Sequence, residues 1–140
     1  MNQSTSSPVA ALSPPVLAGR ILDIRGQRVL LDSDLAQLYE VETRRLNEQI
    51  KRNSGRFPAD FMFQLTEIEF ENLKSQFATS SWGGRRKLPL VFTEHGAIMA
   101  ASVLNSERAV QMSVYVVRAF VQLRALMMDH KVLADKLNHL

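Results

Sequence analysis

Residues 35–50, LAQLYEVETRRLNEQI, have the pattern of two short helices joined by a tight turn. Ala36 is small enough to let the two helices approach each other closely. The positions expected to face inward are apolar: Leu35, Tyr39, Val41, Leu46 and Ile50. Val41 would fill the turn, and Leu46 and Ile50 would anchor the second helix because they lie one helical turn apart. The stretch therefore predicts a helix-turn-helix.

The ends of these two helices are marked by local signals. Side chains able to cap a helix precede each of them: Asp32, Ser33 and Asp34 before the first, and Thr43 before the second. The first helix is expected over residues 35–40 and the second over residues 43–53. Asn53-Ser54-Gly55 would end the second helix, since these residues tolerate the left-handed conformation. Glu40 departs from the usual pattern, in which a glycine is common at the turn.

The outer side of the second helix is polar and mostly basic. The residues left there are Arg44, Arg45, Asn47, Glu48, Lys51 and Arg52. Arginine pairs with guanine O6 and N7, asparagine with adenine, and glutamate accepts a hydrogen bond from cytosine N4. These residue types are therefore suited to a helix that enters the major groove of DNA. Helix pairs of this kind also occur in ordinary proteins, so this pattern alone leaves both interpretations open.

The positive charge of the chain is concentrated in two places. Seventeen Lys and Arg against 14 Asp and Glu give a formal net charge of +3. Between residues 44 and 56 the bases Arg44, Arg45, Lys51, Arg52 and Arg56 are accompanied by one acid, Glu48. A second cluster, Arg85, Arg86 and Lys87, has no acid nearer than Glu94. Such local charge on a near-neutral domain is typical of a phosphate-binding surface, and two solvated surface patches are the alternative.

Composition limits the classes of protein to which the chain can belong. A length of 140 residues suits one domain, and 46% hydrophobic residues are enough for a core. The absence of cysteine excludes a disulfide scaffold, a thiolate zinc site and a cysteine nucleophile. No apolar run approaches the roughly 18 residues of a membrane span, and the first 19 residues lack the basic start of a secretory signal. We therefore expect a cytoplasmic protein without membrane contact.

The segments before the helix pair are expected to be a leader and a hairpin. Residues 1–19 contain three of the five prolines and predict a disordered leader. The domain is expected over residues 20–128. Residues 21–25 and 28–31 read as two strands around a turn at Gly26, which can take positive φ.

The segments after the helix pair alternate between strands and helices. Residues 61–65 have the alternation of a half-buried strand. Thr66 and Glu69 fit a capping box for a helix over residues 67–77. Residues 89–92 read as another short strand.

Residues 78–88, ATSSWGGRRKL, are expected to form a flexible loop. It carries Trp82 next to the second basic cluster, so it could follow backbone phosphates or enter a minor groove. The alternative is a solubilising loop whose Trp82 folds back onto the core.

Two helices are expected to complete the domain. Thr93 would cap a helix that ends at residue 104, and a long helix follows over residues 107–129. The polar residues of the long helix form one narrow stripe: Gln111, Arg118, Gln122 and Asp129. The rest is nearly all apolar, which predicts burial on most of the circumference, either in the core or in a homodimer. The tail, residues 129–140, continues with leucines at helical spacing but is by itself too short for a coiled coil.

Together these features predict an α+β fold: a small antiparallel sheet, a helix-turn-helix-like pair and two long C-terminal helices. Several linked motifs resemble, in their order, the ORF-six-N domain, a KilA-N-like DNA-binding module of bacteria and phages. The motifs are Asp32/Asp34-Leu35-Ala36-Leu38-Tyr39, Leu46-Asn47, Lys51-Arg52-Asn53, Arg56-Phe57-Pro58, Gly83-Gly84-Arg85-Arg86 and Phe92-Thr93-Glu94-His95-Gly96. The resemblance covers roughly residues 21–127. It implies sequence-specific DNA binding, often in phage antirepressor-like or regulatory proteins. Many relatives have Gln where this chain has His95.

Features that suggest chemistry have simpler explanations. Glu94 and His95 could suggest acid–base catalysis, but no third group is available to orient His95, and capping explains Glu94. The three histidines, His95, His130 and His139, lack a metal-ligand spacing. We therefore expect a protein that is not an enzyme and that uses no metal or cofactor.

The sequence predicts binding to double-stranded DNA through the second helix, Thr43 to Asn53, in the major groove. Arg44, Arg45, Asn47 and Glu48 are expected to read bases, and Lys51, Arg52, Arg56, Arg85, Arg86 and Lys87 to bind phosphates. The long C-terminal helix is the candidate surface for a homodimer. The alternative function is a protein-binding antirepressor module that docks onto another regulator.

Overall fold

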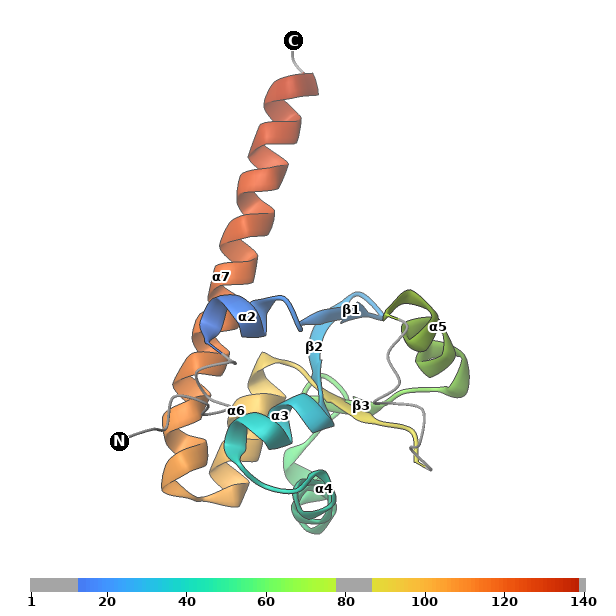
Figure 1. Ribbon diagram of the computed structural model, residues 1–140, viewed down its shortest axis with the longest axis vertical. Coiled ribbons are helices and arrows are strands. Elements are labelled where there is room, and N and C mark those ends of the chain that lie inside the picture. Colours follow the sequence, from blue (N-terminus) through green and yellow to red (C-terminus); the bar gives the residue numbers. More distant parts are fainter. Residues whose placement is uncertain (1–12, 78–86, 139–140) are drawn as a thin grey trace, which may run out of the picture.

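A computed structural model of the chain describes residues 13–77 and 87–138. The sheet has four antiparallel strands in the order β1-β2-β4-β3. Their bounds are Leu22–Ile24 for β1, Gln27–Leu31 for β2, Met62–Gln64 for β3 and Leu90–Phe92 for β4. Helices pack on both faces of this sheet (Figure 1). The α+β fold class predicted from the sequence is confirmed.

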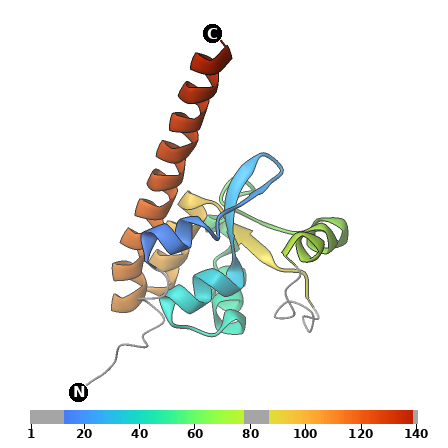
Figure 2. The same ribbon diagram turned by 45° about the horizontal axis from the view of Figure 1, so that its top comes forward.

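Alternation along the strands divides the core into two clusters. Leu30 and Phe92 point to the face covered by helices α3, α4, α6 and α7, whereas Val29, Leu31 and Val91 point to the face covered by α5. Successive strand residues point to opposite faces, so both sides of this short sheet are apolar. Figure 2 shows α5 on the side of the sheet away from α7.

The β1–β2 hairpin forms as expected. Leu22 pairs with Val29 and Ile24 with Gln27, which leaves a two-residue turn. Arg25 and Gly26 have φ values of 57° and 74°. Positive φ at both positions is typical of the turns whose twist matches that of the flanking strands.

Helix α3, Asp32–Tyr39, begins three residues earlier than predicted. The residue at its N-cap is Leu31, and no side chain caps the helix. The expected capping role of Asp32 and Asp34 is therefore wrong. Asp32 is buried inside the first turn, and Asp34 forms an ion pair with Arg20 at 2.9 Å.

A left-handed residue ends α3. Glu40 has φ 57° and ψ 46°, and the backbone N–H of Val41 donates to the Ala36 carbonyl at 3.0 Å. Glycine is favoured at this position, because the left-handed conformation costs a residue with a Cβ roughly 1 kcal/mol. The Glu40 carboxylate forms an ion pair with Arg108 Nη2 at 2.6 Å.

Helix α4, Thr43–Arg52, follows after a short turn. Glu42 occupies its N-cap and Thr43 is its first residue, so the predicted capping by Thr43 is wrong. Asn53 has φ −119°, so the predicted left-handed end is wrong at this residue. The chain instead continues into the 3-10 helix η1, Ser54–Arg56.

The two predicted caps of the following helices are confirmed. At α5, Glu67–Phe77, the Glu69 N–H donates to Thr66 Oγ1, and the Thr66 N–H donates to the Glu69 carboxylate. At α6, Glu94–Leu104, Thr93 Oγ1 accepts from the Gly96 N–H at 3.3 Å. Both signals depend only on neighbouring residues, which explains why the sequence predicts them well.

Part of the expected leader is ordered. Residues Pro14–Ala18 form helix α2, with proline at its first positions. Proline is tolerated there because those N–H groups have no helical partner. Leu17 is fully buried among residues of the core that include α7, so the prediction of a disordered leader is wrong for this segment. Residues 1–12 lie outside the described residues.

Helix α7 is a single helix, Glu107–Asn138. Its buried residues are Ala109, Met112, Val116, Ala119 and Phe120. All of them lie in its first half, and from Arg124 to Asn138 every side chain is exposed. Within this chain the helix is thus buried on one face over half its length, less than its composition predicts. Figure 1 shows the second half extending beyond the domain, at the end opposite to α4.

Candidate nucleic-acid interface

The charged residues of α4 share one side of the helix. Successive residues are separated by 100° around a helix axis, so positions 44, 45, 48, 51 and 52 fall within an arc of about 120°. All five side chains on this arc are exposed: Arg44, Arg45, Glu48, Lys51 and Arg52. We call this surface the outer arc of α4. It carries four cations and one anion.

The cations of the outer arc are not neutralised by the protein. Within the described residues, none of the five side chains forms an ion pair or a side-chain hydrogen bond. Arg56, in η1, is also exposed and equally unpaired among the described residues. By contrast, Arg20, Arg25, Arg108 and Arg124 are engaged by carboxylates elsewhere in the domain. Five exposed, unpaired cations therefore lie on and just after α4.

Apolar contacts fix the opposite side of α4. Leu46 and Ile50 are buried in the larger core cluster, where they pack with residues of α3 and α6. Tyr39 of α3 donates from its hydroxyl to the Ala97 carbonyl at 2.9 Å, and burial raises the pKa of this phenol. The outer arc is thus presented by a helix whose inner side is packed into the core.

Asn47 does not lie on the outer arc. Its side chain is half-buried, and its Nδ2 donates to Asp32 Oδ2 at 3.0 Å. The same carboxylate oxygen accepts from the Leu90 N–H at 3.2 Å. The expected orientation of Asn47 toward a ligand is therefore not observed.

Asp32 consequently connects three elements. It is the first residue of α3, and its side chain joins α4 to the first residue of β4. Its side chain has no solvent exposure. Sequence reasoning assigned Asp32 to capping and missed this role. The available signal was its place directly after the continuous apolar run Val29-Leu30-Leu31, which indicates burial.

The second basic cluster is only partly described. Lys87 is exposed and precedes β4. Only Leu88 and Pro89 lie between it and Leu90, so the Cα atoms of Lys87 and Leu90 are at most about 11 Å apart. Arg85, Arg86 and Trp82 lie outside the described residues. Lys87 therefore lies next to β4, the strand whose first residue is hydrogen-bonded to Asp32, which in turn binds Asn47 of α4.

The segment after α4 packs against the end of β4 and the beginning of α6. Phe57 packs edge-on against Phe92, with ring centroids 6.3 Å apart. Thr93 Oγ1 donates to the Asp60 carbonyl at 2.9 Å. A Cβ added to Gly96 would lie 1.8 Å from the Phe61 carbonyl oxygen. The Arg56-Phe57-Pro58 and Phe92-to-Gly96 motifs therefore meet in space and hold the C-terminal end of α4.

Glu94 and His95 have structural contacts. Glu94 pairs with Arg124 of α7, and the His95 ring stacks on Phe61 with centroids 5.7 Å apart. Among the described residues no group of three or more His, Cys, Asp or Glu side chains could hold a metal ion.

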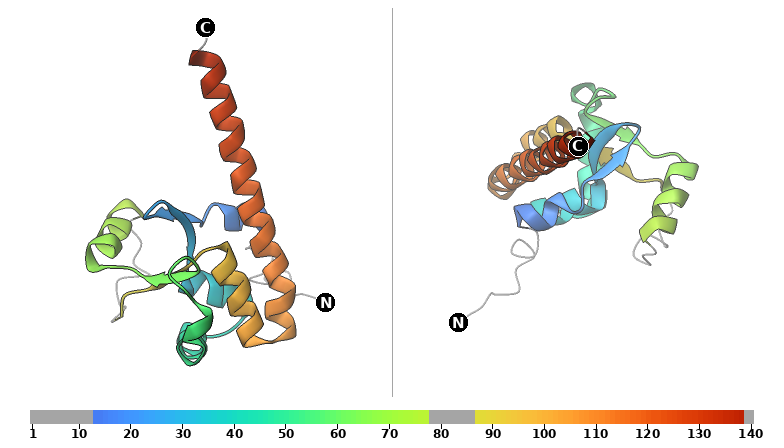
Figure 3. Two further views of the ribbon diagram at one scale, coloured as in Figure 1. Left: turned by 180° about the vertical axis from the view of Figure 1, so that it is seen from behind. Right: turned by 90° about the horizontal axis from the view of Figure 1, so that it is seen from above.

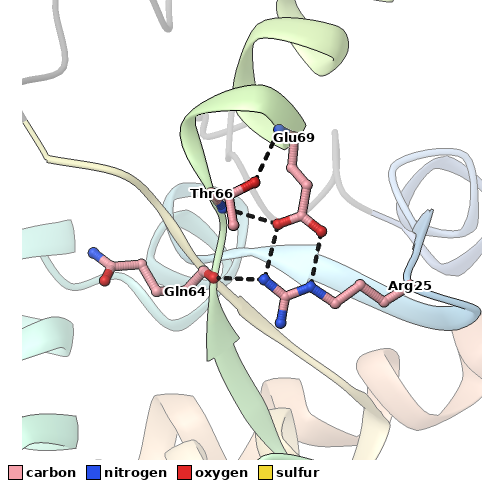
Figure 4. A network of polar contacts seen from close by, with 4 residues as sticks. All are labelled: Arg25, Gln64, Thr66 and Glu69. Atoms are coloured by element: carbon pink, nitrogen blue, oxygen red, sulfur yellow. Dashed lines mark hydrogen bonds and ion pairs between the residues drawn. The ribbon is translucent and has the colours of Figure 1, made fainter.

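A second polar network ties the hairpin to α5 (Figure 4). Arg25 donates to both oxygens of Glu69, at 2.8 and 2.9 Å, and to the Gln64 carbonyl at 3.2 Å. These hydrogen bonds from Arg25, together with one from the Thr66 N–H, lower the pKa of Glu69 to about 2. Arg25, at the tip of the hairpin, is thus paired within the protein, unlike the arginines of the outer arc.

The fold and this site define a small α+β domain with a packed helix pair and a basic second helix. The ORF6N domain model matches residues 19–103, more than half of the chain. The chain therefore belongs to the ORF6N domain family, a phage and bacterial regulatory family. The resemblance predicted from the sequence motifs is confirmed, and α7 lies outside the matched residues. Neither the search of curated proteins nor the search of solved structures gave a match. Over the described residues, no helix has the length and apolar character required to cross a bilayer.

Proposed function

We propose that this chain is a regulatory protein that binds double-stranded DNA sequence-specifically, with α4 in the major groove. The observation that carries the proposal is the outer arc: four exposed, unpaired cations on one side of a helix whose other side is packed into the core. A helix of 10 residues is about 15 Å long, which suits the major groove. The family membership supports the same conclusion.

Residues near the N-terminal end of the outer arc are the proposed base readers. Glu48 lies at the centre of the arc, with Arg44 and Arg45 on either side of it. Arginine suits guanine and glutamate suits cytosine N4, so these side chains carry the sequence preference. Thr43, half-buried at the first turn, can donate to a phosphate through its hydroxyl and backbone N–H.

The remaining cations are the proposed phosphate ligands. Lys51, Arg52 and Arg56 follow one another toward and beyond the C-terminal end of α4. Arg85, Arg86 and Lys87 are proposed to extend this contact along the backbone of the duplex. Asn47 is removed from the base readers, because its amide is occupied by Asp32; we assign it a positioning role.

The proposal is tested by selection from a random duplex library with the purified chain. We expect one enriched sequence, and the double variant R44A/R45A should lose that preference while remaining folded, because alanine is the best helix former. A matched double variant in α7, R118A/K131A, removes two exposed cations and should select the same sequence as the wild type. If no sequence is enriched, or if both double variants behave alike, the proposal fails.

The protein-docking alternative is favoured by one observation, the exposed apolar residues in the second half of α7. It predicts the opposite pattern of effects in a reporter assay. Regulation would survive R44A/R45A and would be lost on polar substitution of α7. In either case the proposed activity is binding and not catalysis.

A further inference from the structure

The apolar positions of α7 follow one continuous seam. The buried residues Ala109, Met112, Val116 and Ala119 alternate at intervals of three and four. The same alternation continues through Leu123, Leu126, His130, Leu133 and Leu137. Such spacing is the heptad pattern that keeps one face of a helix against a partner helix.

The cover over this seam ends halfway along the helix. The four seam residues Ala109, Met112, Val116 and Ala119 are at most 6% exposed, because α2 and α6 pack over them. Leu126, Leu133 and Leu137 are 49%, 56% and 60% exposed. Within the described residues nothing covers them. The pattern that specifies a packed face thus continues for about three turns beyond the domain.

We propose that a second copy of this chain covers the exposed seam, with the two α7 helices antiparallel. In this register Leu126 packs against Leu137 of the second copy, and His130 against its Leu133. Because the arrangement is two-fold symmetric, each of these layers occurs twice. The proposal does not depend on DNA binding.

Charge complementarity selects this orientation. Asp129 and Lys136 flank the seam on the same side, seven residues apart, and neither forms an ion pair among the described residues. An antiparallel pair in the stated register brings Asp129 of each copy beside Lys136 of the other. A parallel pair would place Asp129 beside Ala134 and leave both charges unpaired.

A competing apolar stripe lies on the opposite side of α7. It contains Val114, Val121 and Met128, which are exposed and spaced by seven residues. The alternate positions of that stripe in the second half of the helix are Arg124 and Lys131. Pairing there would bury these cations, whereas the only polar residue within the proposed seam is His130.

The exposed seam is short, since Leu126 to Leu137 spans roughly 17 Å. His130 also replaces an apolar residue in each of the two symmetric central layers, which weakens the pair. We therefore expect a weak, reversible dimer with a dissociation constant on the order of micromolar.

Cysteine crosslinking of the full chain tests the orientation directly, because the chain contains no cysteine of its own. L126C and L137C are prepared separately, one of them with a mass tag, and are oxidised alone and as a mixture. The expected result is a disulfide between the two different variants in the mixture and little product from either variant alone. Efficient homodimer from either single variant would show a parallel pair and overturn the proposal.

Charge reversal and a matched pair of apolar substitutions test the interface. In analytical ultracentrifugation, D129K should weaken the dimer several-fold, and D129K/K136D should restore it. L133D should weaken it at least tenfold, whereas V121D on the opposite stripe should not; both sites are exposed, so the domain stays folded. A monomeric wild type up to hundreds of micromolar, or dissociation by V121D alone, would overturn the proposal.

Discussion

Gly96 lies where α6 approaches the turn after η1 so closely that no side chain fits. The expected cost of G96A is on the order of 3 kcal/mol, because its Cβ would meet the Phe61 backbone oxygen at 1.8 Å. Urea unfolding measures this cost. G55A is the matched control, since nothing lies within 4 Å of its Cβ, and it should leave stability nearly unchanged. Equal stability of both variants would contradict the described packing.

Asn47 and Asp32 form a contact that orients α4 without touching the ligand. N47A leaves the buried Asp32 carboxylate with one donor fewer, which we expect to cost about 1–3 kcal/mol of stability. DNA affinity should fall for all sequences alike, as measured by fluorescence anisotropy on the selected duplex and on a scrambled one. A change in preference at a single base pair would instead mean that Asn47 reads a base.

This pair of residues also shows what the sequence cannot reveal. Both are polar residues in a helical pattern, and an asparagine next to exposed arginines predicts an outward side chain. Asn47 lies at the margin of the outer arc of α4. Whether its side chain points to solvent or to the core therefore depends on the buried carboxylate of Asp32. That carboxylate comes from another helix, and a long-range partner of this kind leaves no local signal.

At the scale of elements, the link between the β1–β2 hairpin and α5 should be sensitive to acid. The pKa of Glu69 is about 2 in the folded chain, below its ordinary value of 4.5. Its ionised form therefore stabilises the fold fully above pH 4.5, and this contribution is lost as the pH falls toward 2.

The variant E69Q tests this link. We expect the difference in unfolding free energy between wild type and E69Q to be constant near neutral pH and to shrink between pH 4.5 and 2. Denaturant unfolding at several pH values measures this. The control is E67Q, because Glu67 lies in the same first turn of α5 and has no ion-pair partner among the described residues. The difference in unfolding free energy between wild type and E67Q should not shrink at low pH. A difference that does not depend on pH would contradict the described network.

Elements whose signals are local were predicted well. The capping box at Thr66, the Thr93 cap and the glycine turn at Gly26 depend on residues within three positions of one another. Elements that depend on distant partners were not. Helix α2 contains two prolines and is ordered because Leu17 is buried against the rest of the domain. The ion pair between Glu40 and Arg108 likewise joins residues 68 positions apart.

At the scale of the whole molecule, the two proposed binding surfaces lie at opposite ends. The outer arc of α4 is at one end, and the exposed half of α7 extends from the other (Figure 3). The two surfaces share no residues, so substitutions on one should leave the other intact. L133D should therefore retain the base preference of the wild type even if its avidity for a two-site duplex falls.

The most direct measurement of the central claim is the salt dependence of affinity for the selected duplex. With about five phosphate contacts, log affinity should fall with log salt at a slope on the order of −4 to −5. The variant K51A/R52A should reduce that slope by about two, and R118A/K131A should leave it unchanged. The account is contradicted if K51A/R52A retains the wild-type slope, because the outer arc of α4 would then not contact the duplex.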